Sequence, residues 1–275
     1  METPGIRRVH VQRVGPAGGP GTAALAVELP LEVRVNGAPF AVIMRTPGDD
    51  QALVAGFLLA EDVVRRANEV VRIEPCTEAD EEARDHVMQA VVQGEAQARL
   101  FERLASRRQV LMTSGCGLCG RRTIASLQSR VDAVTGAWTL AATDVCALPL
   151  RLREAQAVFE ATGGLHAAGL FGRDGRLLDS AEDVGRHNAV DKIVGRQLLA
   201  GRLPLSEAVL MVSGRASFEL VQKALLAGIP IMAAVSAPSS LAVDLAEATG
   251  MTLCGFVRGE TFTIYTHPHR IVTGA

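Results

Sequence analysis

Three short apolar runs in the last third of the chain constrain its fold more than any other feature. The runs at 208–212, 231–235 and 252–257 have the length and composition of buried strands. The segments between them, 216–227 and 239–249, have the apolar spacing of helices. Because strands and helices alternate with short loops, this region predicts a mainly parallel sheet with right-handed crossovers.

The segment before these runs extends the same α/β region. We expect helices at 152–162 and 183–199. Between them lie two apolar stretches separated by Gly172-Arg173-Asp174-Gly175, a composition typical of a turn, so we expect a hairpin at 165–178. The second half of the chain is therefore predicted to form one α/β domain.

The first half predicts a smaller α+β part. Apolar residues alternate from Leu31 to Val35, and Asn36-Gly37 follows, which is the pattern of a β-hairpin with a tight turn. A helical pattern begins after Thr46 and runs to about Arg66. Residues 76–107 are polar and charged, and we expect them to lie at the surface.

These patterns divide the chain into three parts. Gly and Pro are frequent near the start, which predicts a mobile tail. The predicted parts are this tail at 1–22, an N-terminal α+β domain at 23–115, and a cysteine loop with the α/β domain at 116–275.

Composition excludes several classes of protein. The net charge is −2, whereas a nucleic-acid-binding protein is usually basic. No apolar stretch reaches the length of about 18 residues that a membrane-spanning helix needs, and the first residues lack the apolar core of a signal peptide. The five cysteines include only one close pair, which indicates reduced thiols and a cytoplasmic protein.

The close pair is the strongest local signal. Cys116-Gly117-Leu118-Cys119 lies in a glycine-rich loop, and a helical pattern that begins with Arg121-Arg122 follows it. A helix N-terminus and nearby arginines favour the thiolate, which is the reactive form in sulfur exchange. Two other interpretations stay open: half of a zinc site completed by Cys146 and His166, and a thioredoxin-like disulfide pair.

Polar side chains also gather in the α/β region. The expected helix at 183–199 places His187, Asn188, Asp191 and Lys192 on an arc opposite its apolar side chains. The sequence is consistent with a functional cluster and equally with a solvated helix face carrying ordinary ion pairs.

Three loops follow the three strand-like runs. Residues 213–217 contain Arg215, residues 236–240 are rich in serine, and residues 256–261 contain Arg258. Because the carboxyl ends of parallel strands meet at one edge of a sheet, these loops predict a crevice for a phosphate-bearing ligand. No Rossmann or P-loop fingerprint is present to name that ligand.

Taken in order, these residues resemble the formate dehydrogenase accessory sulfurtransferases, the FdhD family. The resemblance covers nearly the whole chain after the tail. Each motif alone is weak evidence for the family, but their order along the chain is specific to it. The matching segments are Val35-Asn36-Gly37, Met44-Arg45-Thr46-Pro47, Gly56-Phe57-Leu58, 116–120, 162–166, 185–192, Ser213-Gly214-Arg215 and 255–259.

The resemblance implies a carrier that takes sulfur from a cysteine desulfurase as a persulfide. It implies delivery of that sulfur to the bis-molybdopterin guanine dinucleotide cofactor (Mo-bisMGD) before the cofactor enters formate dehydrogenase. Cys116 matches the persulfide cysteine and Cys119 its partner. The resemblance further implies a homodimer and a C-terminal three-layer α/β domain like that of cytidine deaminases.

The residues that we expect to bind the cofactor come from the resemblance and from the strand-end loops together. No resident metal ion is expected. The expected cofactor-binding residues are Phe256, Val257, Arg258, Gly259, Glu260, Thr261, Arg215 and His187.

The sequence leaves two alternatives to the sulfur-carrier function. A zinc-dependent deaminase needs His-x-Glu upstream of Pro-Cys-x-x-Cys. Here Ala167-Ala168 follows His166, and the only Cys-x-x-Cys lies upstream of it, so the motif is absent. The other alternative is a non-catalytic chaperone that shelters the molybdenum cofactor, which differs in that Cys116 would acquire no sulfur.

Overall fold

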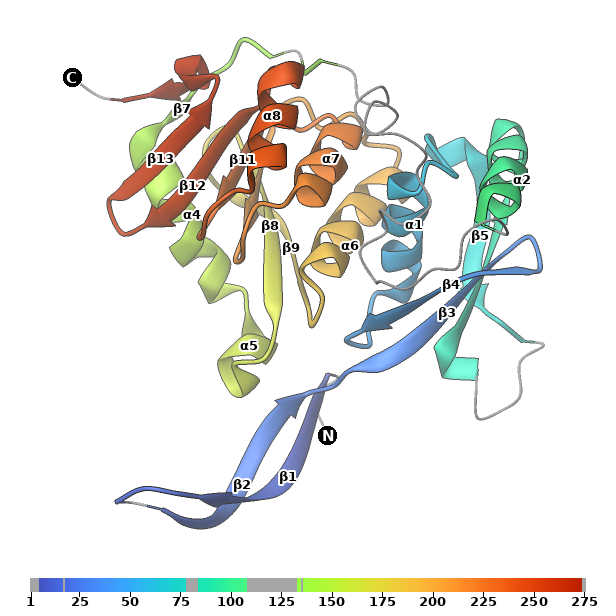
Figure 1. Ribbon diagram of the computed structural model, residues 1–275, viewed down its shortest axis with the longest axis horizontal. Coiled ribbons are helices and arrows are strands. Elements are labelled where there is room, and N and C mark those ends of the chain that lie inside the picture. Colours follow the sequence, from blue (N-terminus) through green and yellow to red (C-terminus); the bar gives the residue numbers. More distant parts are fainter. Residues whose placement is uncertain (1–4, 17, 78–83, 108–132, 135, 274–275) are drawn as a thin grey trace.

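The computed structural model contains two main β-sheets that are joined through a pair of packed helices (Figure 1). The four-stranded sheet belongs to the first half of the chain and the six-stranded sheet to the second. The structure describes residues 5–16, 18–77, 84–107, 133–134 and 136–273.

The six-stranded sheet has the order β13-β12-β11-β10-β8-β9. Strands β10, β11 and β12 are parallel to one another, as predicted, but β8, β9 and β13 are antiparallel to their neighbours. The prediction of a mainly parallel sheet is therefore correct only for the centre, because short turns rather than crossover helices connect the outer strands. The strands are β8 His166–Gly172, β9 Leu177–Asp183, β10 Ala208–Val212, β11 Ile231–Ala234, β12 Thr252–Arg258 and β13 Thr261–Thr266.

Helices cover both faces of this sheet, so that the second half of the chain has three layers (Figure 1). Alternate residues of β10 face opposite layers: Leu210 packs with the core under α6, α7 and α8, and Met211 packs with the core under α4. Burial on both faces explains why the strands are apolar without alternation. A specific likeness to cytidine deaminases stays a prediction. The helices are α4 Ala142–Glu154, α5 Ala157–Thr162, α6 Arg186–Leu199, α7 Phe218–Leu226 and α8 Ser240–Thr249.

The four-stranded sheet has the order β4-β3-β6-β5. The turn between β3 and β4 has positive φ at both Asn36 and Gly37, which confirms the predicted hairpin. The prediction that residues 76–107 lie at the surface is wrong for β6, an inner strand whose Val87, Met88 and Val92 are buried. The elements are β3 Leu29–Val35, β4 Ala38–Arg45, α1 Asp50–Ala60, β5 Val70–Pro75, β6 Val87–Val92 and α2 Glu95–Arg107.

Helices α1 and α6 connect the two sheets by an unusually close crossing. A Cβ atom on Gly56 would lie 2.0 Å from the carbonyl oxygen of Asp191, and one on Gly195 would lie 1.8 Å from that of Ala52. Only glycine permits this approach. One hydrophobic core consequently includes residues of both sheets, from Leu31 to Leu253.

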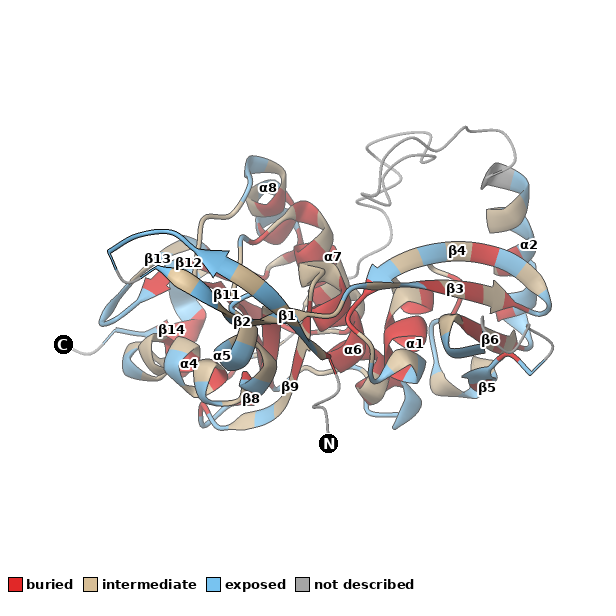
Figure 2. Cartoon of the chain, turned by 90° about the horizontal axis from the view of Figure 1, so that it is seen from below, coloured by how far each residue is buried: buried red, intermediate tan, exposed pale blue. Residues whose placement is uncertain are grey.

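Two strands pair as an antiparallel hairpin in the region where a mobile tail was expected, at 1–22. Strands β1 Ile6–Arg13 and β2 Gly19–Ala26 pair along their full length and project from the body (Figure 1), and their residues are exposed or half-buried (Figure 2). The glycine-rich stretch that suggested a tail includes the connection between these strands and the start of β2. Gly and Pro here therefore mark a turn.

The expected domain boundary at 115/116 lies outside the described residues, so the division into domains stays a prediction. None of the helices in the described ranges is long and apolar enough to cross a membrane. The short elements are β7 Leu140–Ala141, β14 Ile271–Val272 and the 3-10 helices Ala67–Glu69, Arg84–His86 and Pro268–Arg270.

Candidate functional site

The strand-end loops of the six-stranded sheet lie together, as the sequence predicts. The loop after β10 and the loop after β11 are joined by three backbone hydrogen bonds, from Ser236 to Gly214, from Ala216 to Ala237 and from Ser239 to Ala216. The third loop joins them where the Phe256 N–H donates to the Ser236 carbonyl at 3.2 Å. One edge of the sheet thus carries a continuous ridge of loops, called the strand-end site below.

The segment 256–261 ends β12 and turns into β13. Phe256 has a φ of 54° at an irregularity in the strand pairing, and the residue is 42% exposed. Arg258 lies 5.9 Å from that ring centroid and donates from Nε to the Val235 carbonyl. These contacts hold an exposed aromatic ring and a guanidinium at the strand-end site.

Not every residue of this segment faces solvent. Gly259, Glu260 and Thr261 are exposed, and so is Arg215 in the loop after β10. Val257 is fully buried against the core under α4, so its side chain does not face a ligand. Alternate residues of a strand point to opposite faces, so the predicted role of Val257 in binding could involve only its backbone.

His187 is the second residue of α6 and lies beside the same loops. Its Nε2 lies 2.9 Å from Glu219 Oε2 and 3.4 Å from Ser217 Oγ. Because both contacts involve the same ring nitrogen, the three residues do not form a nucleophile–base–acid relay. The structure instead shows an imidazole held by a carboxylate at the N-terminus of α7. Sequence reasoning missed Glu219, which lies on a different helix and has no motif of its own.

His166 and Arg186 lie on the other side of the loop after β10. An alanine Cβ in place of Gly214 would touch the His166 ring at 3.5 Å and Arg186 at 3.9 Å. Burial, followed by the nearby Arg186 and His187, lowers the pKa of His166 below its usual value. His166 is therefore a neutral imidazole at pH 7 that can both donate and accept a hydrogen bond.

The polar arc of α6 is buried, which contradicts the interpretation as a solvated helix face. Asn188, Asp191 and Lys192 are all under 9% exposed. Lys192 pairs with Asp183 at 2.8 Å and Asp191 pairs with Lys223 at 2.5 Å. The helix lies between α1, α7 and the sheet, so each of its polar groups needs a partner within the protein.

Cys116 and Cys119 lie outside the described residues, and the other three cysteines have features of unreactive thiols. Cys76 is buried, and burial raises the pKa of Cys254 to about 12. Burial and then the charge of Glu260 raise the pKa of Cys146. Within the described ranges, no three His, Cys, Asp or Glu side chains are placed to share a metal ion.

The pKa of Cys254 leads to a test. Because a raised pKa keeps the thiol protonated up to about pH 12, Cys254 should react negligibly with a thiol reagent at pH 8. In denaturant, where the pKa returns to about 8.5, labelling should become complete within minutes. Peptide mapping after labelling measures both states. Rapid labelling of Cys254 in the folded protein would contradict its burial.

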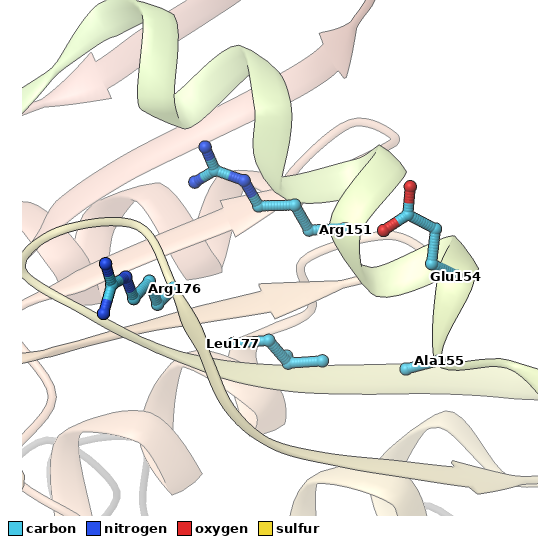
Figure 3. A pocket seen from close by; sticks show the side chains of 5 residues that line it. All are labelled: Arg151, Glu154, Ala155, Arg176 and Leu177. Carbon is cyan, nitrogen blue, oxygen red and sulfur yellow. The ribbon is translucent and has the colours of Figure 1, made fainter.

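A shallow cavity of about 440 Å³ lies at the opposite edge of the sheet (Figure 3). Arg151, Glu154 and Ala155 of the α4 end line it, together with Arg176 and Leu177 before and in β9. Arg151 already donates to the Gly175 carbonyl at 2.5 Å. The cavity contains none of the residues that the sequence predicts to act.

The chain shares its fold with a solved structure. That structure, from Desulfotalea psychrophila and described as a putative formate dehydrogenase accessory protein, matches 98% of this chain and 100% of its own with a TM-score of 0.77 and 23% identity. Residues 26–272 match the model of the FdhD/NarQ family, and the chain belongs to that family.

Relatives of high identity support the same assignment. A protein of Streptomyces avermitilis is 50% identical over 259 residues, which cover 91% of this chain and 90% of the relative. Another, of Nocardia farcinica, is 50% identical over 96% of this chain and 94% of the relative. A third, of Mycobacterium tuberculosis, is 50% identical over 90% of this chain and 91% of the relative. All three bear the name sulfur carrier protein FdhD.

Proposed function

We propose that this protein is a sulfurtransferase that carries sulfur for the maturation of formate dehydrogenase. The observation that carries the proposal is the name shared by the relatives, which match at about half identity over nine tenths or more of the chain. Their name denotes a sulfur carrier, and the solved structure of the same fold is described as a putative formate dehydrogenase accessory protein.

The thiol chemistry of the chain supports a role for the Cys116–Cys119 loop. Cys76 and Cys254 are buried, and the pKa of Cys146 is raised, so that none of the three is suited to exchange. In the proposed first step, the Cys116 thiolate attacks the terminal sulfur of a persulfide on a cysteine desulfurase. A new S–S bond forms on Cys116 as the donor's S–S bond breaks, and the donor cysteine leaves as a thiolate.

The acceptor in the proposal is Mo-bisMGD, a substrate that receives the sulfur before it enters formate dehydrogenase. Its guanine dinucleotides carry pyrophosphate groups, which need cationic or N–H donors. The strand-end site offers Arg215 and Arg258 as exposed cations and Phe256 as a surface on which a ring can stack. His187 lies beside them in the first turn of α6. The proposed assembly is a homodimer in the cytoplasm.

The proposal is tested by intact-mass spectrometry. The protein is incubated with a cysteine desulfurase and cysteine, and peptide mapping then locates the added sulfur. We expect one additional sulfur atom on Cys116, removed by dithiothreitol. A protein that shelters the cofactor without carrying sulfur would show no added mass, and this result would contradict the sulfur-carrier function.

Replacing Arg258 with alanine should weaken binding of guanosine diphosphate. The exposed guanidinium makes a charge-assisted contact worth about 1.5–3 kcal/mol, which corresponds to a loss of roughly 10- to 100-fold in affinity. Calorimetry at low salt measures it. Arg176→Ala provides the matched control, because that exposed arginine lies at the opposite edge of the sheet. Equal affinity of the Arg258 and Arg176 variants would place the ligand elsewhere.

A further inference from the structure

The carboxylate of Asp183, at the end of β9, is fully buried and accepts hydrogen bonds on both oxygens. Oδ1 accepts from the Gly185 N–H and from Asn188 Nδ2, each at 2.8 Å. Oδ2 accepts from the Thr46 N–H at 3.1 Å and pairs with Lys192 Nζ at 2.8 Å. Four donors therefore surround one charge, which satisfies the requirements of a buried carboxylate.

These contacts define where α6 begins. Gly185 is the N-cap residue of the helix, and it has no side chain that could cap the first turn. Asn188 reaches back instead, donating to Asp183 and to the Met44 carbonyl. A Cβ atom on Gly185 would lie only 2.8 Å from the Asn188 amide nitrogen. The first turn of α6 is consequently held by Asp183 against the connection between β4 and α1.

The same turn carries two side chains of the strand-end site. Arg186 lies beside the Gly214 backbone, and its Nε is buried with no hydrogen-bond partner among the residues that the structure describes. His187 contacts Ser217 and Glu219. A shift in the start of α6 would move both side chains relative to the loops after β10 and β11.

We propose that Asp183 is a positioning residue, which sets the geometry of the strand-end site for its nucleotide ligand through the first turn of α6. This inference rests on the proposed function, because it assigns the strand-end site to the guanine dinucleotide of the acceptor. Asp183 itself lies beneath the site and touches no ligand. Its effect should appear in ligand affinity and not in the loading of sulfur on Cys116.

The test compares binding of guanosine diphosphate with loading of sulfur in the same variants. Asp183→Asn keeps the shape of the side chain but turns one acceptor oxygen into an N–H₂ donor that faces other donors. We expect affinity for guanosine diphosphate, measured by calorimetry, to fall about tenfold, which corresponds to roughly 1.4 kcal/mol. Loading of sulfur by the desulfurase, measured by mass spectrometry, should remain at the level of the unaltered protein.

A second variant separates positioning from stability. Asp183→Asn leaves Lys192 buried without its counter-ion, which destabilises the fold. The double variant D183N/K192M removes both charges, so its Tm should recover part of the loss while its affinity stays about tenfold reduced. Asp179→Asn is the matched control. Asp179 joins the same strand and helix at their other ends, through Arg196 and Gln197, and its loss should leave affinity unchanged.

The outcomes distinguish the two proposals. Unaltered affinity for guanosine diphosphate in D183N/K192M would overturn the role of Asp183, and so would an equal loss in Asp179→Asn. The absence of binding to the unaltered protein would also overturn it. If the unaltered protein takes no sulfur from the desulfurase but Asp183 variants still lose affinity, the sulfur-carrier function fails and the positioning role stands.

Discussion

Cys116→Ala should leave the protein folded and unable to accept sulfur from a cysteine desulfurase. The thiolate is the nucleophile that forms the persulfide, so its removal eliminates the bond-forming atom and not merely a binding contact. We expect loss of sulfur loading to the detection limit of intact-mass spectrometry, and loss of formate dehydrogenase maturation in a complementation assay. Tm should change by no more than about 2 °C, since the sequence predicts a glycine-rich loop around Cys116 and substitutions in such loops usually cost under 0.5 kcal/mol.

Two further cysteine variants make the result specific. Cys146→Ser removes a half-buried thiol with a raised pKa and should load sulfur normally. Cys119→Ala distinguishes a relay from an accessory role. If Cys119 is accessory, the variant still loads sulfur on Cys116, but more slowly. If Cys119 relays the sulfur, the variant cannot deliver it to the acceptor. Full maturation activity of Cys116→Ala would contradict the proposed function.

Gly195→Ala should destabilise the protein more than other single-methyl additions. The new Cβ would lie 1.8 Å from the Ala52 carbonyl oxygen and 2.7 Å from the Gly56 nitrogen, both backbone atoms that cannot rotate away. Helices α1 and α6 must then separate, which opens the core shared by the two sheets. We expect a loss of about 3 kcal/mol or more in the free energy of unfolding, and a fall in Tm of roughly 10 °C.

Gly136→Ala is the control for this experiment. Gly136 has no positive φ, and its new Cβ would meet its nearest neighbour at 3.5 Å, which is ordinary van der Waals contact. Its Tm should stay within about 2 °C of the unaltered protein. Thermal unfolding followed by circular dichroism measures both variants. A Gly195 variant as stable as the Gly136 variant would show that the helices cross farther apart than the structure has them.

Local patterns were sufficient to predict much of the fold. The β3–β4 hairpin follows from Asn36-Gly37, because the two positive φ values of a tight hairpin turn suit these two residues. Strand β10 lies at its predicted bounds, and β11 and β12 lie within one residue of theirs, because fully buried strands form short apolar runs. The loops that follow these three strands were predicted to lie together, because the strands are parallel and their carboxyl ends meet at one edge of the sheet.

Contacts between distant parts of the chain decided the rest. Thr46 and Asp183 are neighbours in space but lie 137 residues apart, and Glu219 reaches His187 from another helix. Strand β6 is an inner strand because β3 and β5 pair with it on both sides, and its Met88 and Val92 are buried in the core that the sheet shares with α1 and α6. The periodicity of a sequence shows which face of a helix or strand is apolar, because residues on the same face recur at short, regular spacings along the chain. Which polar groups are buried together depends on how the elements pack, and only the assembled tertiary structure shows that α6 is enclosed on its polar side as well.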